Sequence, residues 1–217
     1  FKIKKGEKIA IVGENGAGKS TLIDILLQLY EPTEGTVTIG GVDIKEYRQE
    51  SFLKNFSVVP QFFNIFAASV SENILLDFGQ ADSESAIKEA LKKVELSDKI
   101  KDLKDGLDCQ MTKEFDENGL VLSGGEMQKI AIARIFVDHS PIIIMDEPSS
   151  ALDPVSEYHI FKNIFEFFEG DTIIFISHRL YVSALSDRIV VMENGRIIEE
   201  GTHKELLAGH GKYEALY

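Results

Sequence analysis

The chain has 217 residues and is acidic, with 36 Asp and Glu, 23 Lys and Arg and a formal net charge of −13. This charge repels phosphate backbones at long range, which argues against a nucleic-acid partner. No apolar run has the length needed to cross a bilayer, and the single cysteine, Cys109, excludes an internal disulfide and fits a reducing compartment.

The beginning of the chain predicts a strand, a helix and a hairpin. Residues 8–13, "KIAIVG", are a short apolar run ending in Gly, which is typical of a buried strand that enters a loop. Residues 19–30, "KSTLIDILLQLY", predict a helix that Pro32 prevents from continuing. The apolar positions of this helix are Leu22, Ile25, Leu26 and Leu29. After the alternating "TVTI", Gly40-Gly41 indicates the turn of a hairpin.

The middle of the chain predicts one strand followed by helices. "NFSVVPQ" indicates a strand that is broken at Pro60, and residues 62–126 after it are interpreted as a mainly helical insertion. Glu84 and Lys88 can pair one helical turn apart. One apolar helical face in this region is formed by Ala86, Ala90, Leu91 and Val94.

The last part of the chain returns to strands. Residues 141–146, "PIIIMD", and 171–177, "DTIIFIS", are continuous apolar runs, as expected of parallel strands covered on both faces. A hairpin is predicted to turn at Asn194-Gly195, and "THKE" from Thr202 is a capping box that starts a helix. Because strands alternate with helices, the predicted fold class is α/β.

Residues 13–21, "GENGAGKST", carry a complete P-loop pattern between the predicted strand and helix. The glycines allow several backbone amides to point at one anion, and the helix N-terminus adds its positive end. Lys19 can reach the β- and γ-phosphates, and the Ser20 hydroxyl can hold Mg²⁺. The alternative is a glycine-rich turn before an ordinary helix, but the strand–helix context favours a nucleotide site. Its residues are Gly13, Glu14, Asn15, Gly16, Ala17, Gly18, Lys19, Ser20 and Thr21.

A pair of carboxylates follows the strand "IIIMD". Asp146 is expected to accept a hydrogen bond from Mg²⁺-bound water or from Ser20, and Glu147 to polarise an attacking water. Taken alone, an Asp-Glu pair after a strand is usually a solvated loop. The presence of a P-loop reverses that balance and favours phosphoryl-transfer chemistry.

Two further polar residues follow predicted strands. Gln61 can reach Mg²⁺ or water through its amide oxygen, and His178, after "TIIFIS", can donate to a γ-phosphate. A lone Gln is usually surface, and a lone His at a strand end is usually structural. The remaining histidines show no metal-ligand spacing and receive no role: His139, His159, His203 and His210.

The segment "LSGGE" combines residues that favour the start of a helix with residues that destabilise it. Ser123 and Glu126 form a capping box that starts a helix. Gly124 and Gly125 then occupy the first turn, where glycine lowers helix stability and leaves backbone amides uncovered. A bare, capped N-terminus attracts anions, so the segment is either an anion site or only a helix cap.

In the order P-loop, Gln, "LSGGE", "IIIMDE", "SALD" and His, these motifs resemble the nucleotide-binding domain of an ATP-binding cassette (ABC) transporter. The resemblance covers essentially the whole chain. It implies a P-loop NTPase (RecA-like) core, an N-terminal antiparallel β-subdomain and an inserted α-helical subdomain. The implied boundaries are 1–61 and 127–217 for the core and β-subdomain, and 62–126 for the helical subdomain. Because Phe1 opens inside a strand-like run, we expect an N-terminally truncated domain without its membrane domain.

The resemblance also implies a role for each motif. Residues 13–21 would be Walker A, Gln61 the Q-loop, 122–126 the signature, 142–146 Walker B, Glu147 the catalytic glutamate, 150–153 the D-loop and His178 the switch histidine. ATP and Mg²⁺ are the implied cofactors, with the metal held by Ser20, Gln61 and Asp146. Catalysis would depend on Glu147, His178, Lys19 and Gln61. In this family two domains pair head to tail, so nucleotide contacts across the seam are expected from Ser123, Gly124, Gly125 and Asp153.

The subclass implied is the exporter branch, which "QFFNIFAASVSENI", "SHRL" and "GTHKELLAGHGKYEALY" resemble. The expected partners are a second nucleotide-binding domain, identical or different, and a transmembrane domain, at the cytoplasmic face of the cell membrane. The isolated domain is expected to be soluble. An apolar cluster lies where the family receives the membrane domain, with ordinary core packing as an equal alternative: Phe62, Phe63, Ile65 and Phe66.

Several positions depart from the family pattern. Glu126 stands where Gln is commoner and brings a negative charge near a bound phosphate, which predicts slower turnover. Lys129 replaces the usual Arg, and Asp116 occupies a usual Gly position. The aromatic that stacks on adenine lies upstream of Phe1, so we expect weaker ATP binding than in the full-length protein.

The sequence disfavours two other classes of function. A soluble ABC ATPase acting on DNA or ribosomes would need a long coiled-coil insertion or a second cassette, and neither is present in the sequence. A module that binds nucleotide without hydrolysing it is disfavoured because Glu147 and His178 are both present.

Overall fold

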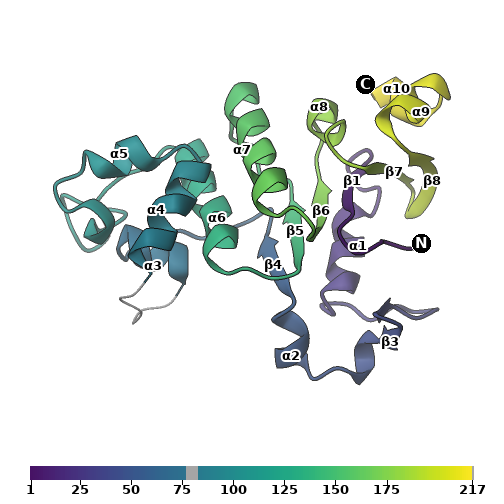
Figure 1. Ribbon diagram of the computed structural model, residues 1–217, viewed down its shortest axis with the longest axis horizontal. Coiled ribbons are helices and arrows are strands. Elements are labelled where there is room, and N and C mark those ends of the chain that lie inside the picture. Colours follow the sequence, from purple (N-terminus) through teal and green to yellow (C-terminus); the bar gives the residue numbers. More distant parts are fainter. Residues whose placement is uncertain (77–82, 217) are drawn as a thin grey trace. The chain divides into compact units, whose positions relative to one another are not determined.

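The computed structural model describes residues 1–76 and 83–216. They form two compact units (Figure 1). The first unit comprises Phe1–Val58, Ser140–Glu147 and Gly170–Tyr217, and the second comprises Val59–His139 and Pro148–Glu169. The second unit thus takes in residues on both sides of the helical insertion expected at 62–126, and those subdomain boundaries stay a prediction. Among the described residues, we find no helix of the length and apolarity needed to cross a membrane.

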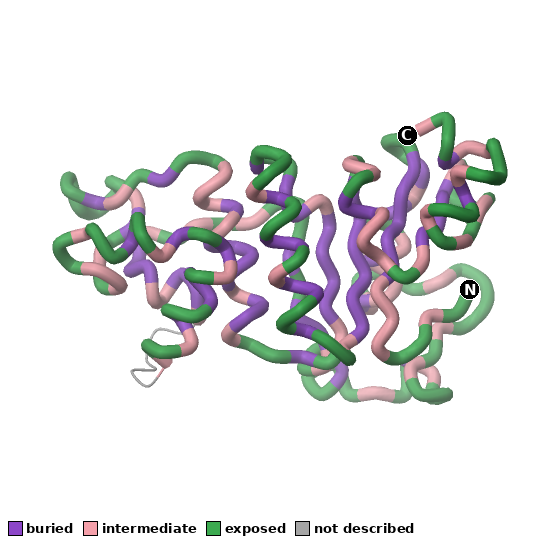
Figure 2. Tube along the Cα trace, turned by 45° about the horizontal axis from the view of Figure 1, so that its top comes forward, coloured by how far each residue is buried: buried purple, intermediate pink, exposed green. Residues whose placement is uncertain are grey.

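The first unit contains a twisted sheet with strands in the order β4-β5-β6-β1-β7-β8. The strands are β1 (Lys8–Val12), β4 (Phe56–Val59), β5 (Ile142–Asp146), β6 (Thr172–Ile176), β7 (Arg188–Glu193) and β8 (Arg196–Gly201). Strand β1 pairs in parallel with β6 and β7, and β5 pairs in parallel with β6. Figure 2 shows these central strands as continuous buried stretches, which confirms the strands predicted from the apolar runs.

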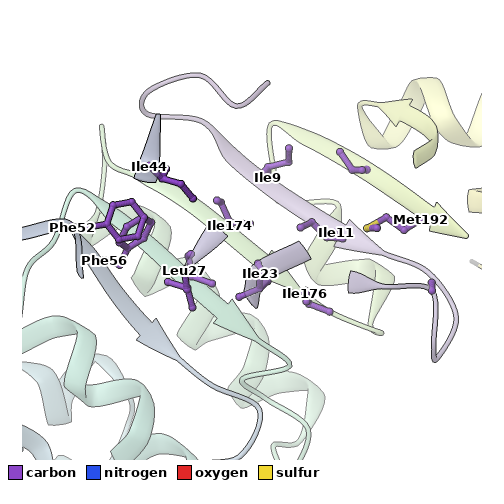
Figure 3. Packing of buried hydrophobic residues seen from close by; sticks show 13 residues of the cluster. Ile9, Ile11, Ile23, Leu27, Ile44, Phe52, Phe56, Ile174, Ile176 and Met192 are labelled. Atoms are coloured by element: carbon purple, nitrogen blue, oxygen red, sulfur yellow. The ribbon is translucent and has the colours of Figure 1, made fainter. Parts of the chain in front are cut away.

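A hydrophobic cluster joins the sheet to helix α1 (Lys19–Leu26) (Figure 3). Ile9 and Ile11 alternate along β1 and share this cluster with Ile23 and Leu27. Further large members, from β6, from β4 and from the segment before β4, include Ile44, Phe52, Phe56, Ile174 and Ile176. The helix was predicted correctly, and its core-facing side was predicted in part. Leu22 and Leu26 are half-buried and pack against the cluster as predicted, whereas Ile25 is only half-buried and Leu29 is exposed. The fully buried residues here are Ile23 and Leu27, which were not predicted, and Leu27 is the C-cap of α1.

Two hairpins confirm the turns predicted from glycine. Strands β2 (Thr38–Ile39) and β3 (Val42–Asp43) are antiparallel around Gly40 and Gly41, whose φ angles are 61° and 86°. Strands β7 and β8 are antiparallel around Asn194 and Gly195, with φ angles of 50° and 74°. Positive φ at both central positions is the requirement of the type I′ turn, which explains the residue choice. The small β2–β3 sheet supplies the antiparallel β element expected near the N-terminus.

Short helices complete the first unit. They are η1 (Ile44–Glu46), α2 (Gln49–Leu53), α8 (Leu180–Ser183), α9 (His203–Ala208) and α10 (Lys212–Leu216). The capping box predicted before α9 is present: the Thr202 side chain accepts from the Glu205 amide at 3.3 Å, and Glu205 Oε2 accepts from the Thr202 amide at 2.8 Å. These two bonds satisfy amides that the first turn of a helix leaves open.

The second unit is helical in its described part. Its helices are α3 (Val70–Leu75), α4 (Glu84–Lys93), α5 (Ser97–Lys101), η2 (Gly106–Asp108), α6 (Gly124–Val137) and α7 (Pro154–Phe167). On α4 the buried apolar residues are Ile87, Ala90 and Leu91, and Lys88 pairs with Glu84 at 2.5 Å as predicted. Arg134 of α6 donates to the backbone oxygens of Asn73 at 3.0 Å and Asn64 at 2.7 Å, which fixes the segment around α3 to α6.

An ion pair at the start of β1 and β7 gives a stability prediction for the first unit. Arg188 donates to both carboxylate oxygens of Glu7, at 2.7 and 2.9 Å, and to Glu200 at 2.6 Å. Burial by itself would raise the pKa of Glu7, but the hydrogen bonds from Arg188 lower it below its ordinary value. The carboxylate therefore stabilises the fold above its unfolded pKa of about 4.3, and this contribution is lost as the pH falls through the lower folded value.

We expect Glu7→Gln to reduce the free energy of unfolding at pH 7 by roughly 1–3 kcal/mol, because a charged hydrogen-bond pair is lost. The difference from the wild type should shrink in acid below about pH 4. Urea denaturation at pH 7 and pH 3.5 measures both effects. Glu200→Gln is the matched control, since it loses a more exposed partner of the same guanidinium and should cost less. Equal losses in both variants at both pH values would contradict the assignment.

Candidate functional site

The predicted P-loop connects β1 to α1 and is held close to the β7–β8 hairpin. Gly13 has a φ of 150°, and a Cβ there would collide with the backbone oxygen of Met192. Gly18, the N-cap of α1, has a φ of 95° and no side-chain cap, so the first amides of α1 are covered by no side chain from the cap position. The Gly195 amide donates to Ala17 O at 3.0 Å, which ties the loop to the hairpin. Such a backbone arrangement before a helix is suited to bind phosphate.

Lys19 places a buried cation inside this loop. Its side chain is 5% exposed, and Nζ donates to the backbone oxygens of Gly13 at 2.9 Å and Glu14 at 3.0 Å. Burial lowers the pKa of Lys19, while the negative charges of Glu147 and Asp146 act in the opposite direction. The lysine is therefore part of the loop's own hydrogen bonding and lies among the acidic residues of the site.

Asp146 ends β5 and carries an orphaned oxygen. The residue is 9% exposed, and its Oδ1 is one of the buried side-chain atoms of the described chain that have no hydrogen-bond partner. Burial raises the pKa of Asp146, and the hydrogen bond with the Ser20 side chain lowers it in part. A buried carboxylate oxygen beside a hydroxyl suits a divalent cation with oxygen ligands. Ser20 and Asp146 are therefore the residues whose chemistry suits Mg²⁺ and that would hold it.

Glu147 and His178 meet because their strands are neighbours. In the parallel β5–β6 ladder Asp146 is paired with Ile176, so the residues just beyond both strands emerge side by side. His178 Nε2 lies 2.6 Å from Glu147 Oε1, and the Glu147 amide donates to Ile176 O at 3.1 Å. Glu147 has a φ of 48°, a conformation that a non-glycine residue adopts at a cost. The arrangement orients a carboxylate, and a water held beside it can be polarised.

The signature segment begins α6 in the second unit and forms the predicted capping box. Ser123 Oγ accepts from the Glu126 amide at 3.3 Å, and Glu126 Oε2 accepts from the Ser123 amide at 2.8 Å. The other oxygen of Glu126 forms an ion pair with Lys99 at 2.6 Å. Burial by itself raises the pKa of Glu126, but the hydrogen bonds from Lys99 and Ser123 lower it overall. The negative charge expected near a bound phosphate is thus paired within this unit.

Gly125 is required by a close backbone contact that the sequence does not reveal. A Cβ on Gly125 would lie 2.9 Å from the backbone oxygen of Ala151, whereas one on Gly124 would lie 3.8 Å from the Ala151 side chain. The first turn of α6 therefore packs against the D-loop residues. Glycine at position 125 serves this packing as well as any role in anion binding.

The remaining predicted residues also belong to the second unit. Asp153 is the N-cap of α7: its Oδ1 accepts from the amides of Val155 at 3.1 Å and Ser156 at 3.0 Å, and these bonds lower the pKa of Asp153. Gln61 follows β4 and is exposed. The structure thus brings together the P-loop, Asp146, Glu147 and His178 in the first unit, and Ser123, Gly125 and Asp153 in the second.

Two residues that contact these motifs were missed in the sequence. Lys212 of α10 forms ion pairs with Glu14 of the P-loop at 2.7 Å and with Glu193 at 2.8 Å, and both raise the pKa of Lys212. Gln128 of α6 is 2% exposed and bonds the D-loop. For Gln128 a signal did exist, because it stands four residues before Ile132 on the buried face of α6. No local pattern indicates the partners of Lys212.

The chain matches a known protein family and several named relatives. The family model described as "ABC transporter" matches residues 1–150. The "Lactococcin transport/processing ATP-binding protein LcnC-like" of Lactococcus lactis subsp. lactis is 39% identical over 215 residues, which are 99% of this chain and 29% of that protein. The "ATP-dependent lipid A-core flippase" of Methylobacillus flagellatus is 42% identical over 217 residues, which are 100% of this chain and 36% of that protein.

A solved structure supports the same relationship. The structure of a bacterial Atm1-family ABC exporter with ATP bound matches with a TM-score of 0.90 and 36% sequence identity, covering 100% of this chain and 37% of that chain. This chain therefore spans between 29% and 37% of the length of these proteins.

Proposed function

This chain belongs to the ABC transporter family, and we propose that it is the ATP-binding and ATP-hydrolysing domain of an exporter. The family resemblance drawn from the motifs is confirmed. The observation that carries the proposal is the assembly, in one compact unit, of a phosphate-binding loop containing a buried lysine, a buried carboxylate with an orphaned oxygen, and an oriented Glu147–His178 pair. Phosphoryl transfer to water requires these parts.

In the proposed reaction, the P-loop amides and Lys19 bind the triphosphate of ATP. Ser20 and Asp146 would hold Mg²⁺, with Gln61 as a further proposed ligand; the cation would neutralise charge on the phosphate oxygens. Glu147 polarises the attacking water, and His178 keeps the Glu147 carboxylate in position at 2.6 Å. His178 is also proposed to donate a hydrogen bond to the γ-phosphate. It would do so by exchanging its bond with Glu147 for one with the phosphate when ATP is bound.

The proposal includes a second copy or a homologous domain as partner. Ser123 and Asp153 lie in the unit that does not contain the P-loop. In the family arrangement these residues complete the nucleotide site of the neighbouring domain, and nucleotide binding would close the pair. The pairing of Glu126 with Lys99 supports this role, because it reduces the charge that an incoming phosphate would meet.

A transmembrane domain at the cytoplasmic face of a membrane is the other proposed partner. The side chain of Phe62 is 87% exposed and that of Phe66 is 44% exposed, while Phe63 and Ile65 are half-buried. Such exposure is more consistent with a contact surface than with core packing. The names of the relatives support transport as well, since one is described as a flippase and another as a transport/processing protein.

The test is whether ATP and magnesium together drive association and phosphate release. We expect the chain to sediment as a monomer with ADP and to form dimers with ATP, because the γ-phosphate supplies the contact for Ser123 of the neighbouring copy. Phosphate release should require Mg²⁺ and rise with the square of protein concentration while dimers are rare. The control is Ser123→Ala, which should weaken association and leave binding to the P-loop of the single chain intact. Hydrolysis that stays first order in protein would contradict a shared site.

A further inference from the structure

Gln128 is a buried polar residue on α6, and the other buried residues of this helix are all apolar. Its side chain is 2% exposed, and it is surrounded along α6 by the buried residues Ile130, Ala131 and Ile132. Burying an amide is unfavourable unless both its donor and its acceptor find partners. In this chain both do so, and both partners lie in the D-loop. Gln128 Nε2 donates to Ser150 Oγ at 3.2 Å, and Gln128 Oε1 accepts from the Ala151 amide at 2.8 Å.

The contact depends on the chemistry of an amide side chain. The Ala151 amide needs an acceptor, and the Ser150 hydroxyl is met by a donor. A leucine or methionine of similar size would fill the space and leave the Ala151 amide without its acceptor. A glutamate would keep the acceptor but place a charge at a buried position. Glutamine therefore joins the helix to the loop without burying a charge.

Other contacts fix the same loop within this unit. Gly125 allows the first turn of α6 to approach Ala151 O, where a Cβ would lie at 2.9 Å. Ser149 Oγ donates to the buried carboxylate of Glu157 on α7. Asp153 caps α7 through its bonds with the two amides that follow. The loop 149–153 is thus attached to α6 at one side and to α7 at the other, and Gln128 supplies the hydrogen bonds of the α6 side.

We propose that Gln128 is a positioning residue that locks the loop 149–153 to the start of α6, so that Ser123 and Asp153 meet a second copy of this chain as one preformed surface. This inference rests on the proposed function, since it concerns the surface that completes the neighbouring nucleotide site. We use the word lock for the two hydrogen bonds of Gln128 with Ser150 and Ala151. When they are formed, association of two copies does not have to order the loop 149–153 separately from the signature segment. Without the lock, each binding event carries that additional ordering cost.

Three variants of the whole chain test the lock directly. Amide hydrogen exchange should be about tenfold faster at Ala151 in Gln128→Met than in the wild type, because the Ala151 amide loses the acceptor that Gln128 Oε1 provides. In Gln128→Glu, which retains an oxygen acceptor, much of the protection at Ala151 should remain. The matched control is Ile130→Val, a buried change on the same helix that destabilises the chain without removing a hydrogen bond. It should leave exchange at Ala151 close to that of the wild type.

The functional readout separates positioning from a loss of stability. We expect Gln128→Met to weaken ATP-dependent dimerisation by about tenfold and to lower kcat by a similar factor. Binding of ATP to the single chain, whose P-loop lies in the other unit, should stay within about twofold of the wild type. Ile130→Val should change none of these quantities by more than about twofold at a temperature where the chain is folded.

Each outcome decides a separate part of the inference. Unchanged exchange at Ala151 in Gln128→Met would overturn the lock. Faster exchange combined with dimerisation equal to that of Ile130→Val would overturn the positioning role. If the wild type itself neither dimerised nor released phosphate, the proposed function and with it the positioning role would fail, while the exchange rates at Ala151 would still decide whether the lock exists.

Discussion

Glu147→Gln is expected to stop ATP turnover while leaving ATP binding intact. The amide keeps the shape of the carboxylate and can still bond His178, but it cannot polarise the attacking water. General-base catalysis of this kind contributes about 10²–10⁴-fold, so phosphate release should fall by at least 100-fold. Because hydrolysis no longer reopens the pair, the variant should accumulate as an ATP-bound dimer. Size-exclusion chromatography at saturating ATP, together with a phosphate assay, measures both results.

The control for this variant is Glu84→Gln, which removes an exposed carboxylate that pairs with Lys88 on α4. It should turn over ATP as the wild type does, since its salt bridge is exposed and contributes little. A Glu147→Gln protein that stayed monomeric at saturating ATP and released phosphate at the normal rate would disprove the role given to Glu147. Loss of both binding and turnover would instead indicate a structural role near the P-loop.

Lys19→Met is expected to lower ATP affinity by about ten- to a hundredfold, because the charged hydrogen bonds to the triphosphate are lost. In the absence of nucleotide, we expect the same substitution not to lower the stability of the folded state. Burial lowers the pKa of Lys19, so at neutral pH the buried ammonium costs the folded state free energy, and this cost fades as the pH rises through the lowered pKa. Removing the charge should therefore leave the melting temperature unchanged or raise it.

Calorimetric titration with ATP and thermal denaturation with and without ATP measure these two effects. Lys88→Met, a change at an exposed position on α4, is the control and should alter neither affinity nor stability substantially. An unchanged ATP affinity in Lys19→Met would remove Lys19 from the phosphate site. A melting temperature far below that of the wild type would show that the bonds from Nζ to Gly13 O and Glu14 O hold the loop together.

Much of the local structure could be predicted because its causes are local. Apolar runs predicted the strands β1, β5 and β6, and the pairs Gly40-Gly41 and Asn194-Gly195 predicted the two hairpins. The capping boxes at Ser123 and Thr202 form as expected, since the residues that make them are three apart in the chain. A third box, from Ser69 to Glu72, was not predicted although it follows the same rule.

Contacts between distant residues could not be predicted in this way. Lys99 lies 27 residues from Glu126, and Gln128 lies 23 residues from Ala151. Nothing in the sequence between them indicates that they touch, because the path of the chain is set by packing of the helices. The buried face of α1 was predicted only in part for a related reason. Leu22 and Leu26 do pack against the core cluster, but the residues buried most deeply in it, Ile23 and Leu27, are determined by contact with the sheet.

The sequence by itself determined which chemical groups are present and in what order: a glycine-rich phosphate loop with Lys19, a strand ending in Asp146-Glu147, a capped glycine-rich helix start and a late histidine. Only the tertiary structure decided how these groups are used. Pairing of β5 with β6 brings His178 to Glu147, and close packing of α6 on the loop 149–153 requires Gly125 and satisfies Gln128. The physical reason is that hydrogen bonds and burial act over a few ångströms in space, whatever the separation along the chain.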